Sequence, residues 1–212
     1  MKEIMISIQP KWCELIASGK KTVEIRKTRP KLDTPFRCYI YCTKPSRKHQ
    51  TICGCIVLND DELYRHPTQG IKHGDSIELM CRDDYTKDNF LNGKVIGEFV
   101  CDSIVSVGYN KNGYGLDNFV INEVVVKSCI QEKDLYKYLK GEIPYLWHIS
   151  DFVIYDTPKS LDTFRSPCLK IKPCEACRCS VNDDLPFAEI SVGCDRMIRR
   201  PPRSWCYVEK LR

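Results

Sequence analysis

The sequence lacks any long hydrophobic run. No stretch approaches the roughly 18 apolar residues that a membrane-spanning helix needs. The opening Met1-Lys2-Glu3 is not followed by the apolar segment of a signal peptide. There is also no internal repeat and no low-complexity tract. These absences argue against a membrane partner, and we expect a cytoplasmic protein.

The residues that are present suit one compact domain. A chain of 212 residues with 42% hydrophobic content can form a substantial core. We therefore expect a single domain over 1–212 with insertions. Its many short alternating segments and few helical ones predict an α+β fold. Strands are predicted near 3–8, 21–27, 36–42, 51–58, 76–80, 94–107, 120–126, 147–155 and 203–209, and helices at 10–18 and 131–140 with a turn near 158–164.

The first thirty residues contain the clearest local pattern. Residues 3–8 alternate as a half-buried strand does, Pro10 suits the first turn of a helix, and Gly19 suits its end. On the strand that follows, Glu24 and Arg26 share one face. This face is either a donor-rich functional surface or a solvated strand face with a salt bridge.

Charge is unevenly distributed along the chain. The net charge is +5, but residues 1–50 contain 12 Lys/Arg against 4 Asp/Glu, and residues 196–212 contain 6 against 1. The remaining middle segment is acidic. A basic face beside a polar cleft is typical of a protein with a phosphate-bearing partner, although lysine-rich surfaces also serve solubility alone.

The fourteen cysteines do not form an evident disulfide framework. Without a secretion signal, reduced thiols or metal ligands are the expected states. Five of them lie among apolar alternations and are interpreted as small buried hydrophobic residues: Cys38, Cys42, Cys53, Cys55 and Cys101.

The segment 168–199 is a cysteine-rich insertion poor in large apolar residues. A tight group of thiolates with one distant partner is the ligand set of a tetrahedral, structural zinc site. Cys168 is an alternative for one ligand, and a cysteine-rich loop without metal is the competing interpretation. The four candidate ligands are Cys174, Cys177, Cys179 and Cys194.

Two linked motifs, Ile8-Gln9-Pro10-Lys11-Trp12 and Gly19-Lys20-Lys21-Thr22-Val23-Glu24-Ile25-Arg26-Lys27, resemble the opening of the ASCH domain. Segments 39–44, 93–99, 146–159 and 200–208 resemble its phage and gut-bacterial branch. The ASCH family belongs to the PUA-like superfamily. The resemblance therefore implies a small PUA-like β-barrel flanked by two or three helices, with loop insertions, in which the two basic ends merge into one face.

The resemblance also implies a cleft between the first helix and the barrel, with Lys21, Glu24 and Arg26 as its catalytic candidates. In the family's N4-acetylcytidine amidohydrolases, the matching lysine is base or nucleophile. A threonine three residues later is Glu24 here, and Glu132 is the nearest candidate for a further glutamate. A charged Lys21 paired with Glu24 suits gripping a phosphate or a base edge better than attacking an amide.

Three function classes follow. The first is an RNA-binding module for single-stranded or modified nucleotides, in which aromatic rings stack bases. The second is an enzyme, either an N-acylated nucleoside amidohydrolase or a ribonuclease, that uses Lys21. The third is a zinc-stabilised interaction protein. We favour the first, with Trp12 and Trp205 assigned to the core. The nucleic-acid-binding candidates are Lys20, Lys21, Arg26, Lys27, Tyr41, Lys44, Trp147 and His148.

Further candidates lie around the expected cleft. Tyr39 and Tyr114 are additional stacking rings, and the loop with Arg47, Lys48 and His49 suits phosphate contact or plain solvation. The segment 108–118 is predicted to be a loop beside the barrel mouth. His148 is either a base contact or an ordinary structural residue of a strand.

Overall fold

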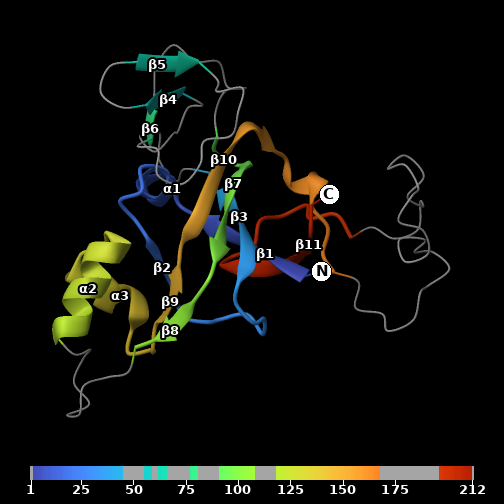
Figure 1. The fold of residues 1–212 in the computed structure, drawn as a ribbon. Helices are drawn as coiled ribbons and strands as arrows, with labels where there is room; N and C mark the ends of the chain where they lie inside the picture. Colours follow the sequence, from blue (N-terminus) through green and yellow to red (C-terminus); the bar gives the residue numbers. More distant parts are fainter. Residues whose placement is uncertain are drawn as a thin grey trace.

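The computed structural model describes residues 2–44, 91–107, 118–167 and 196–211, with the backbone alone of three further strands and of residues 118–120. A five-stranded sheet in the order β10-β7-β3-β1-β11 forms its centre (Figure 1). β1 and β3 are parallel, and the other neighbours in this sheet are antiparallel. Its strands are β1 (Lys2–Ile8), β3 (Phe36–Cys42), β7 (Val95–Cys101), β10 (Ser150–Lys159) and β11 (Trp205–Glu209).

A second sheet has the order β2-β9-β8 and is joined to the first through bends in the chain. β7 continues into β8, and β9 continues into β10, so the same two chain segments contribute to both sheets. A third sheet, β5-β4-β6, is described by its backbone. The strands of these two sheets are β2 (Val23–Arg26), β8 (Ile104–Ser106), β9 (Tyr145–His148), β4 (Cys55–Leu58), β5 (Glu62–Arg65) and β6 (Ile77–Met80).

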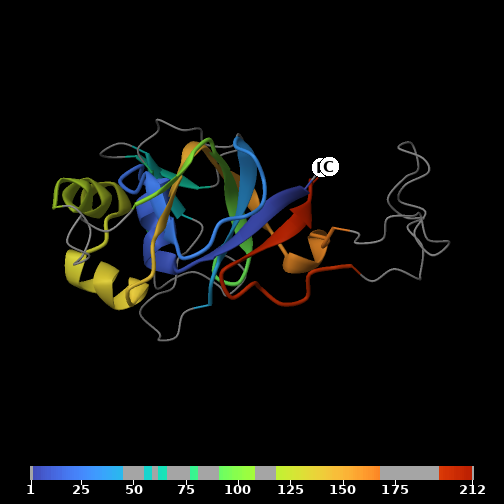
Figure 2. The same cartoon turned by 90° about the horizontal axis from the view of Figure 1, so that it is seen from below.

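Three α-helices accompany the sheets in the described part of the chain, which confirms an α+β fold. α1 (Pro10–Ala17) begins with proline at its first position and buries Cys13, Ile16 and Ala17 on one side. α2 (Asn118–Ser128) and α3 (Glu132–Leu139) lie together at one end of the molecule, and both chain termini lie at the other (Figure 1). Figure 2 shows the same separation. A short 3₁₀ helix, η3 (Leu161–Thr163), follows β10.

The prediction of a strand over 120–126 was wrong, because this segment belongs to α2. Its β-branched run is typical of strands. However, Ile121 and Val124 are three residues apart and both buried in a cluster with Ile25 and Leu135, which is helical spacing. Tertiary packing therefore outweighs local propensity here.

The expectation of a closed barrel was also wrong, since the described strands form open sheets. Closure would require a backbone ladder between β2 and the β1–β11 edge, but β2 pairs with β9 alone among the described strands. A side chain bridges this seam instead. Arg26 Nη2 donates to Ser7 O at 2.7 Å, and Nη1 donates to Ser204 Oγ at 3.2 Å.

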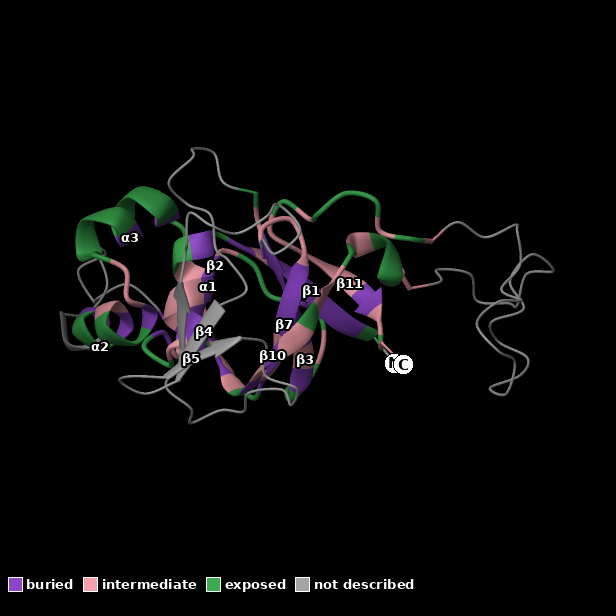
Figure 3. Cartoon of the chain, turned by 90° about the horizontal axis from the view of Figure 1, so that it is seen from above, coloured by how far each residue is buried: buried purple, intermediate pink, exposed green. Residues whose placement is uncertain are grey.

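The main hydrophobic core lies between the five-stranded sheet, α1 and β9. Figure 3 shows buried residues concentrated on β1, β3 and β7. Trp147 is fully buried there, in edge contact with Phe36. Cys38, Cys42 and Cys101 are buried as predicted, whereas the side chains of Cys53 and Cys55 lie outside the described residues.

Burial makes the core thiols sensitive to alkaline pH. Burial raises the pKa of Cys38 well above its ordinary value and that of Cys101 to about 12. Unfolded thiols ionise near pH 8.5, so the unfolded state gains charge first as pH rises. We expect the free energy of unfolding to be unaffected by these thiols below about pH 8 and to fall above it. The slope approaches about 1.4 kcal/mol per pH unit for each thiol.

Urea denaturation at neutral pH and at pH 10 measures this effect. Cys101→Ala removes one buried thiol, so its free energy of unfolding should depend less steeply on pH than that of the wild type. Equal slopes for the two proteins would contradict the assignment. Cys129→Ala is a suitable control, because Cys129 is only partly buried and its removal should leave the pH dependence of the free energy of unfolding nearly unchanged.

Candidate functional site

A cavity of about 930 Å³ opens between α1, β2 and the segment that precedes β11. Its described lining contains six cationic side chains, three aromatic rings and a single carboxylate, that of Glu24. The cations are Lys21, Arg26, Lys27, Lys44, Arg199 and Arg203, and the rings are Trp12, Tyr41 and Tyr138. This composition suits a planar, negatively charged ligand.

Lys21 forms part of the cavity wall in the turn after α1. The helix ends at Ala17, and Gly19 follows its C-cap residue with a φ of 69°, a conformation that favours glycine. Lys21 is 4% exposed, and its Nζ lies 2.8 Å from Val23 O, 2.9 Å from Ser128 O and 3.2 Å from Glu24 Oε2. An ammonium group has three N–H donors, and each has an acceptor here. This arrangement suits a fixed cation better than a base.

Glu24 and Arg26 lie on the same face of β2, as their spacing predicts. Arg26 Nη2 lies 2.9 Å from Glu24 Oε1, so the carboxylate is held between two cations. Glu24 is 7% exposed and Arg26 is 8% exposed. Because Arg26 also bonds Ser7 and Ser204, it links the cavity wall to β1 and to the chain before β11.

The cationic rim comes from both ends of the chain. Lys27 and Lys44 belong to the first fifty residues, whereas Arg199 and Arg203 belong to the basic C-terminal segment. Lys27 Nζ pairs with Glu142 Oε1 at 2.7 Å and lies 5.5 Å from the centre of the Tyr138 ring. The five-stranded sheet causes this meeting, because β11 pairs with β1.

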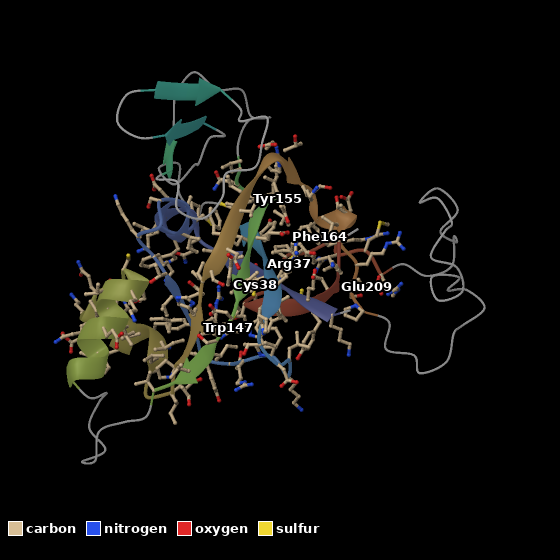
Figure 4. All side chains as sticks on the ribbon, viewed as in Figure 1. Arg37, Cys38, Trp147, Tyr155, Phe164 and Glu209 are labelled. Atoms are coloured by element: carbon tan, nitrogen blue, oxygen red, sulfur yellow. The ribbon has the colours of Figure 1, made fainter. Side chains whose placement is uncertain are left out.

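Three of the predicted contacts lie elsewhere in the structure. Lys20 is exposed and does not line the cavity. Trp147, which is labelled in Figure 4, is in the core, and its ring contacts those of Phe36 and Trp205. Glu132, the candidate for a further glutamate, is exposed in the first turn of α3 and is absent from the cavity lining.

His148 also lies outside the cavity lining, on β9. Its Nδ1 lies 2.7 Å from Asp102 Oδ1, and about half of each side chain is exposed. Partial burial works to raise the pKa of Asp102, but the hydrogen bond and charge of His148 outweigh it and lower that pKa. These contacts match the structural interpretation of this histidine.

Tyr39 is buried and does not line the cavity, contrary to the expectation that it stacks on a base. Its hydroxyl donates to Glu3 Oε2, and its ring is in edge contact with Phe164. Glu3 Oε1 also lies 3.6 Å from Nε of Arg37, the residue labelled in Figure 4, and Arg37 pairs with Glu98. This polar cluster ties β1, β3 and β7 together away from the cavity.

Four charged or aromatic residues of the lining were not among the predicted contacts: Trp12, Tyr138, Arg199 and Arg203. Trp12 was assigned to the core, and it does pack partly against it, but it also lines the cavity. Lys11 Nζ lies 4.1 Å from the centre of its ring, and Lys21 Nζ lies 5.1 Å from it. The basic run before β11 was the sequence signal for the two arginines.

Several predictions fall on residues outside the described part of the chain. These are the zinc ligands Cys174, Cys177, Cys179 and Cys194 with Cys168, the basic loop residues Arg47, Lys48 and His49, and Tyr114 with the loop 108–118. Within the described ranges, no group of three or more His, Cys, Asp or Glu could hold a metal. Among the described helices, none has the length and apolar character of a membrane span. The zinc site stays a prediction.

Comparison with known proteins finds similarity to one family. Residues 6–97 match the model of the ASCH domain. A crystal structure of ASCH from Zymomonas mobilis aligns with a TM-score of 0.50 at 19% identity, over 98% of this chain and 88% of that one. A crystal structure of a mutant of the Zymomonas mobilis protein aligns with a TM-score of 0.43 at 20% identity, over 76% of this chain and 78% of that one. No curated protein sequence matches the chain.

The matched range contains most of the cavity wall. It includes α1, the turn with Lys21, and β2 with Glu24 and Arg26, whereas Arg199 and Arg203 lie outside it. The Zymomonas mobilis structure supports the fold alone at this level of identity. The phage and gut-bacterial branch stays a prediction. Residues 6–97 of this chain are therefore similar to the ASCH domain.

Proposed function

We propose that the protein binds single-stranded RNA, with one nucleotide in the cavity and neighbouring phosphates on its cationic rim. The observation that carries this proposal is the convergence of two distant basic segments on one cavity that also has aromatic walls. Single-stranded RNA offers phosphates for the cations and unpaired bases for the rings. The ASCH match agrees with this function class.

The cavity divides naturally into two parts with different roles. Lys44 and Arg203 are exposed at the rim, where a phosphate can approach them without loss of existing ion pairs to buried groups. Lys21 and Arg26 are buried and already bond Glu24. We therefore assign phosphate contact to the rim and base contact to the wall.

Titration of a labelled single-stranded RNA at increasing salt tests the proposal. Phosphate contacts release counterions, so log affinity should fall linearly with log salt, with a slope of about −0.7 per contact for a single strand. We expect the variant Lys44→Glu/Arg203→Glu to bind more weakly and with a shallower slope. Absence of RNA binding by the wild type would overturn the proposal.

A matched control has the same change in charge away from the cavity. Lys2 and Lys133 are both exposed and outside the lining. Lys2→Glu/Lys133→Glu should retain most of the affinity and the slope, because only general attraction changes. An equal loss in both double variants would mean that the cavity rim has no special role.

The amidohydrolase alternative can be tested with the same protein. Incubation with N4-acetylcytidine, followed by mass spectrometry, should yield no cytidine, since Glu24 and two backbone carbonyls engage the three N–H donors of Lys21. Cytidine formed by the wild type would instead support the enzyme, and its loss in a folded Lys21→Ala protein would assign the reaction to Lys21.

A further inference from the structure

We infer that the cavity selects guanine, and that Glu24 is the residue that reads the base. This inference rests on the proposed nucleotide binding. Glu24 is the only carboxylate in the described lining, and two cations beside it fix it in place. A buried, immobile acceptor facing a cavity discriminates between bases, whereas exposed cations attract every nucleotide alike.

The carboxylate of Glu24 retains capacity to accept hydrogen bonds. An ionised carboxylate has about four acceptor positions. Arg26 Nη2 takes one at Oε1 and Lys21 Nζ takes one at Oε2. Each oxygen can therefore accept one more N–H, and the two oxygens together can accept two parallel donors.

Guanine alone among the four RNA bases presents two adjacent N–H donors, N1–H and the exocyclic N2–H₂, on its Watson–Crick edge. Adenine and cytosine place a ring nitrogen lone pair beside their amino group, and this lone pair faces the second carboxylate oxygen unfavourably. Uracil flanks its one N–H with two carbonyl oxygens. Single-stranded RNA exposes this edge for such contacts.

Arg26 adds a cation at the side of this carboxylate. It lines the cavity, and its Nη2 lies 2.9 Å from Glu24 Oε1. Guanine carries an acceptor, O6, next to its N1–H donor. When its N–H donors face the carboxylate of Glu24, O6 lies on the side where a cation such as Arg26 can stand.

Changes in the ligand test the inference without altering the protein. Calorimetric titrations would compare GMP with IMP, which lacks the N2 amino group, with 1-methyl-GMP, which lacks N1–H, and with AMP, CMP and UMP. We expect GMP to bind about tenfold or more tightly than each of the others, because each loses a hydrogen bond to a charged group. Equal affinity for GMP and IMP would overturn the inference.

The outcomes separate this inference from the proposed function. Equal binding of all the nucleotides leaves RNA binding in place and overturns guanine selection. Absence of binding by any nucleotide or RNA overturns both.

A protein-side test uses Glu24→Gln, with Glu123→Gln as the control. Glu123 is exposed on α2 and pairs with Lys127. In Glu24→Gln the new amide presents only one acceptor oxygen, so the preference for GMP over AMP should be lost while phosphate attraction persists. A preference that survives in a folded Glu24→Gln protein would overturn the assignment to Glu24. If this variant does not fold, the comparison of GMP with IMP remains decisive.

Discussion

Replacement of Lys21 by methionine should lower the free energy of unfolding by about 3–5 kcal/mol, the usual cost of removing one partner from a buried ion pair. Methionine resembles lysine in length but has no N–H donor. The change leaves the carbonyls of Val23 and Ser128 without this donor and removes one of the two cations beside Glu24. Urea denaturation followed by circular dichroism measures the difference.

Lys20→Met is the matched control for this prediction. Lys20 precedes Lys21 directly and is exposed, so its loss should change stability by no more than about 0.5 kcal/mol. Similar unfolding midpoints for the two variants would show that the contacts of Lys21 contribute little.

The double variant Lys21→Met/Glu24→Gln separates charge from packing. When both partners of a buried pair are removed, no carboxylate is left without its cation. The double variant should therefore be more stable than the sum of the two single changes suggests. This result also bears on function, because activity lost in a Lys21 variant can reflect damage to the wall rather than a missing base.

The sequence was a good guide to the wall of the site. Proline at the start of α1, glycine at its end and the alternation on β2 place Lys21, Glu24 and Arg26 together, and these rules depend on local backbone geometry. Local geometry operates over a few residues, so it can be recognised without knowledge of the tertiary fold.

The sequence was a poorer guide wherever burial depends on distant segments. Alternation along β9 separates Trp147 from His148 but does not say which side faces a cavity. In the structure, Trp147 faces the core and His148 pairs with Asp102. The β-branched run of α2 misled for the same reason, since its packing partners come from β2 and α3.

The open seam is a further feature that no local pattern reveals. β1 is paired with β3 on one side and with β11 on the other, and β2 pairs with β9 among the described strands. Arg26 spans the resulting gap with hydrogen bonds to Ser7 and Ser204. The sequence marks Arg26 as a candidate, but its second role as a bridge requires the fold.

Trp147→Ala should destabilise the protein by about 3–5 kcal/mol, as truncation of a large buried aromatic side chain generally does. The ring is fully buried, in edge contact with Phe36 at 5.8 Å between centroids and tilted against Trp205 at 6.1 Å. Its indole Nε1 has no hydrogen-bond partner among the described residues. Neither substitution breaks a hydrogen bond, so the size of the cavity decides the loss of stability. Trp147→Phe leaves a smaller cavity and should destabilise the protein less than Trp147→Ala does.

Trp12→Ala should affect RNA affinity more than stability, since Trp12 lines the cavity and is only partly buried. We expect a smaller loss of stability than in Trp147→Ala. The loss of RNA affinity should be larger, about 1–3 kcal/mol if the ring stacks on a base. Denaturation curves and RNA titrations on both variants measure these two quantities independently. If Trp147→Ala instead folds as stably as the wild type and loses RNA affinity, Trp147 and not Trp12 is the ring that stacks on the base.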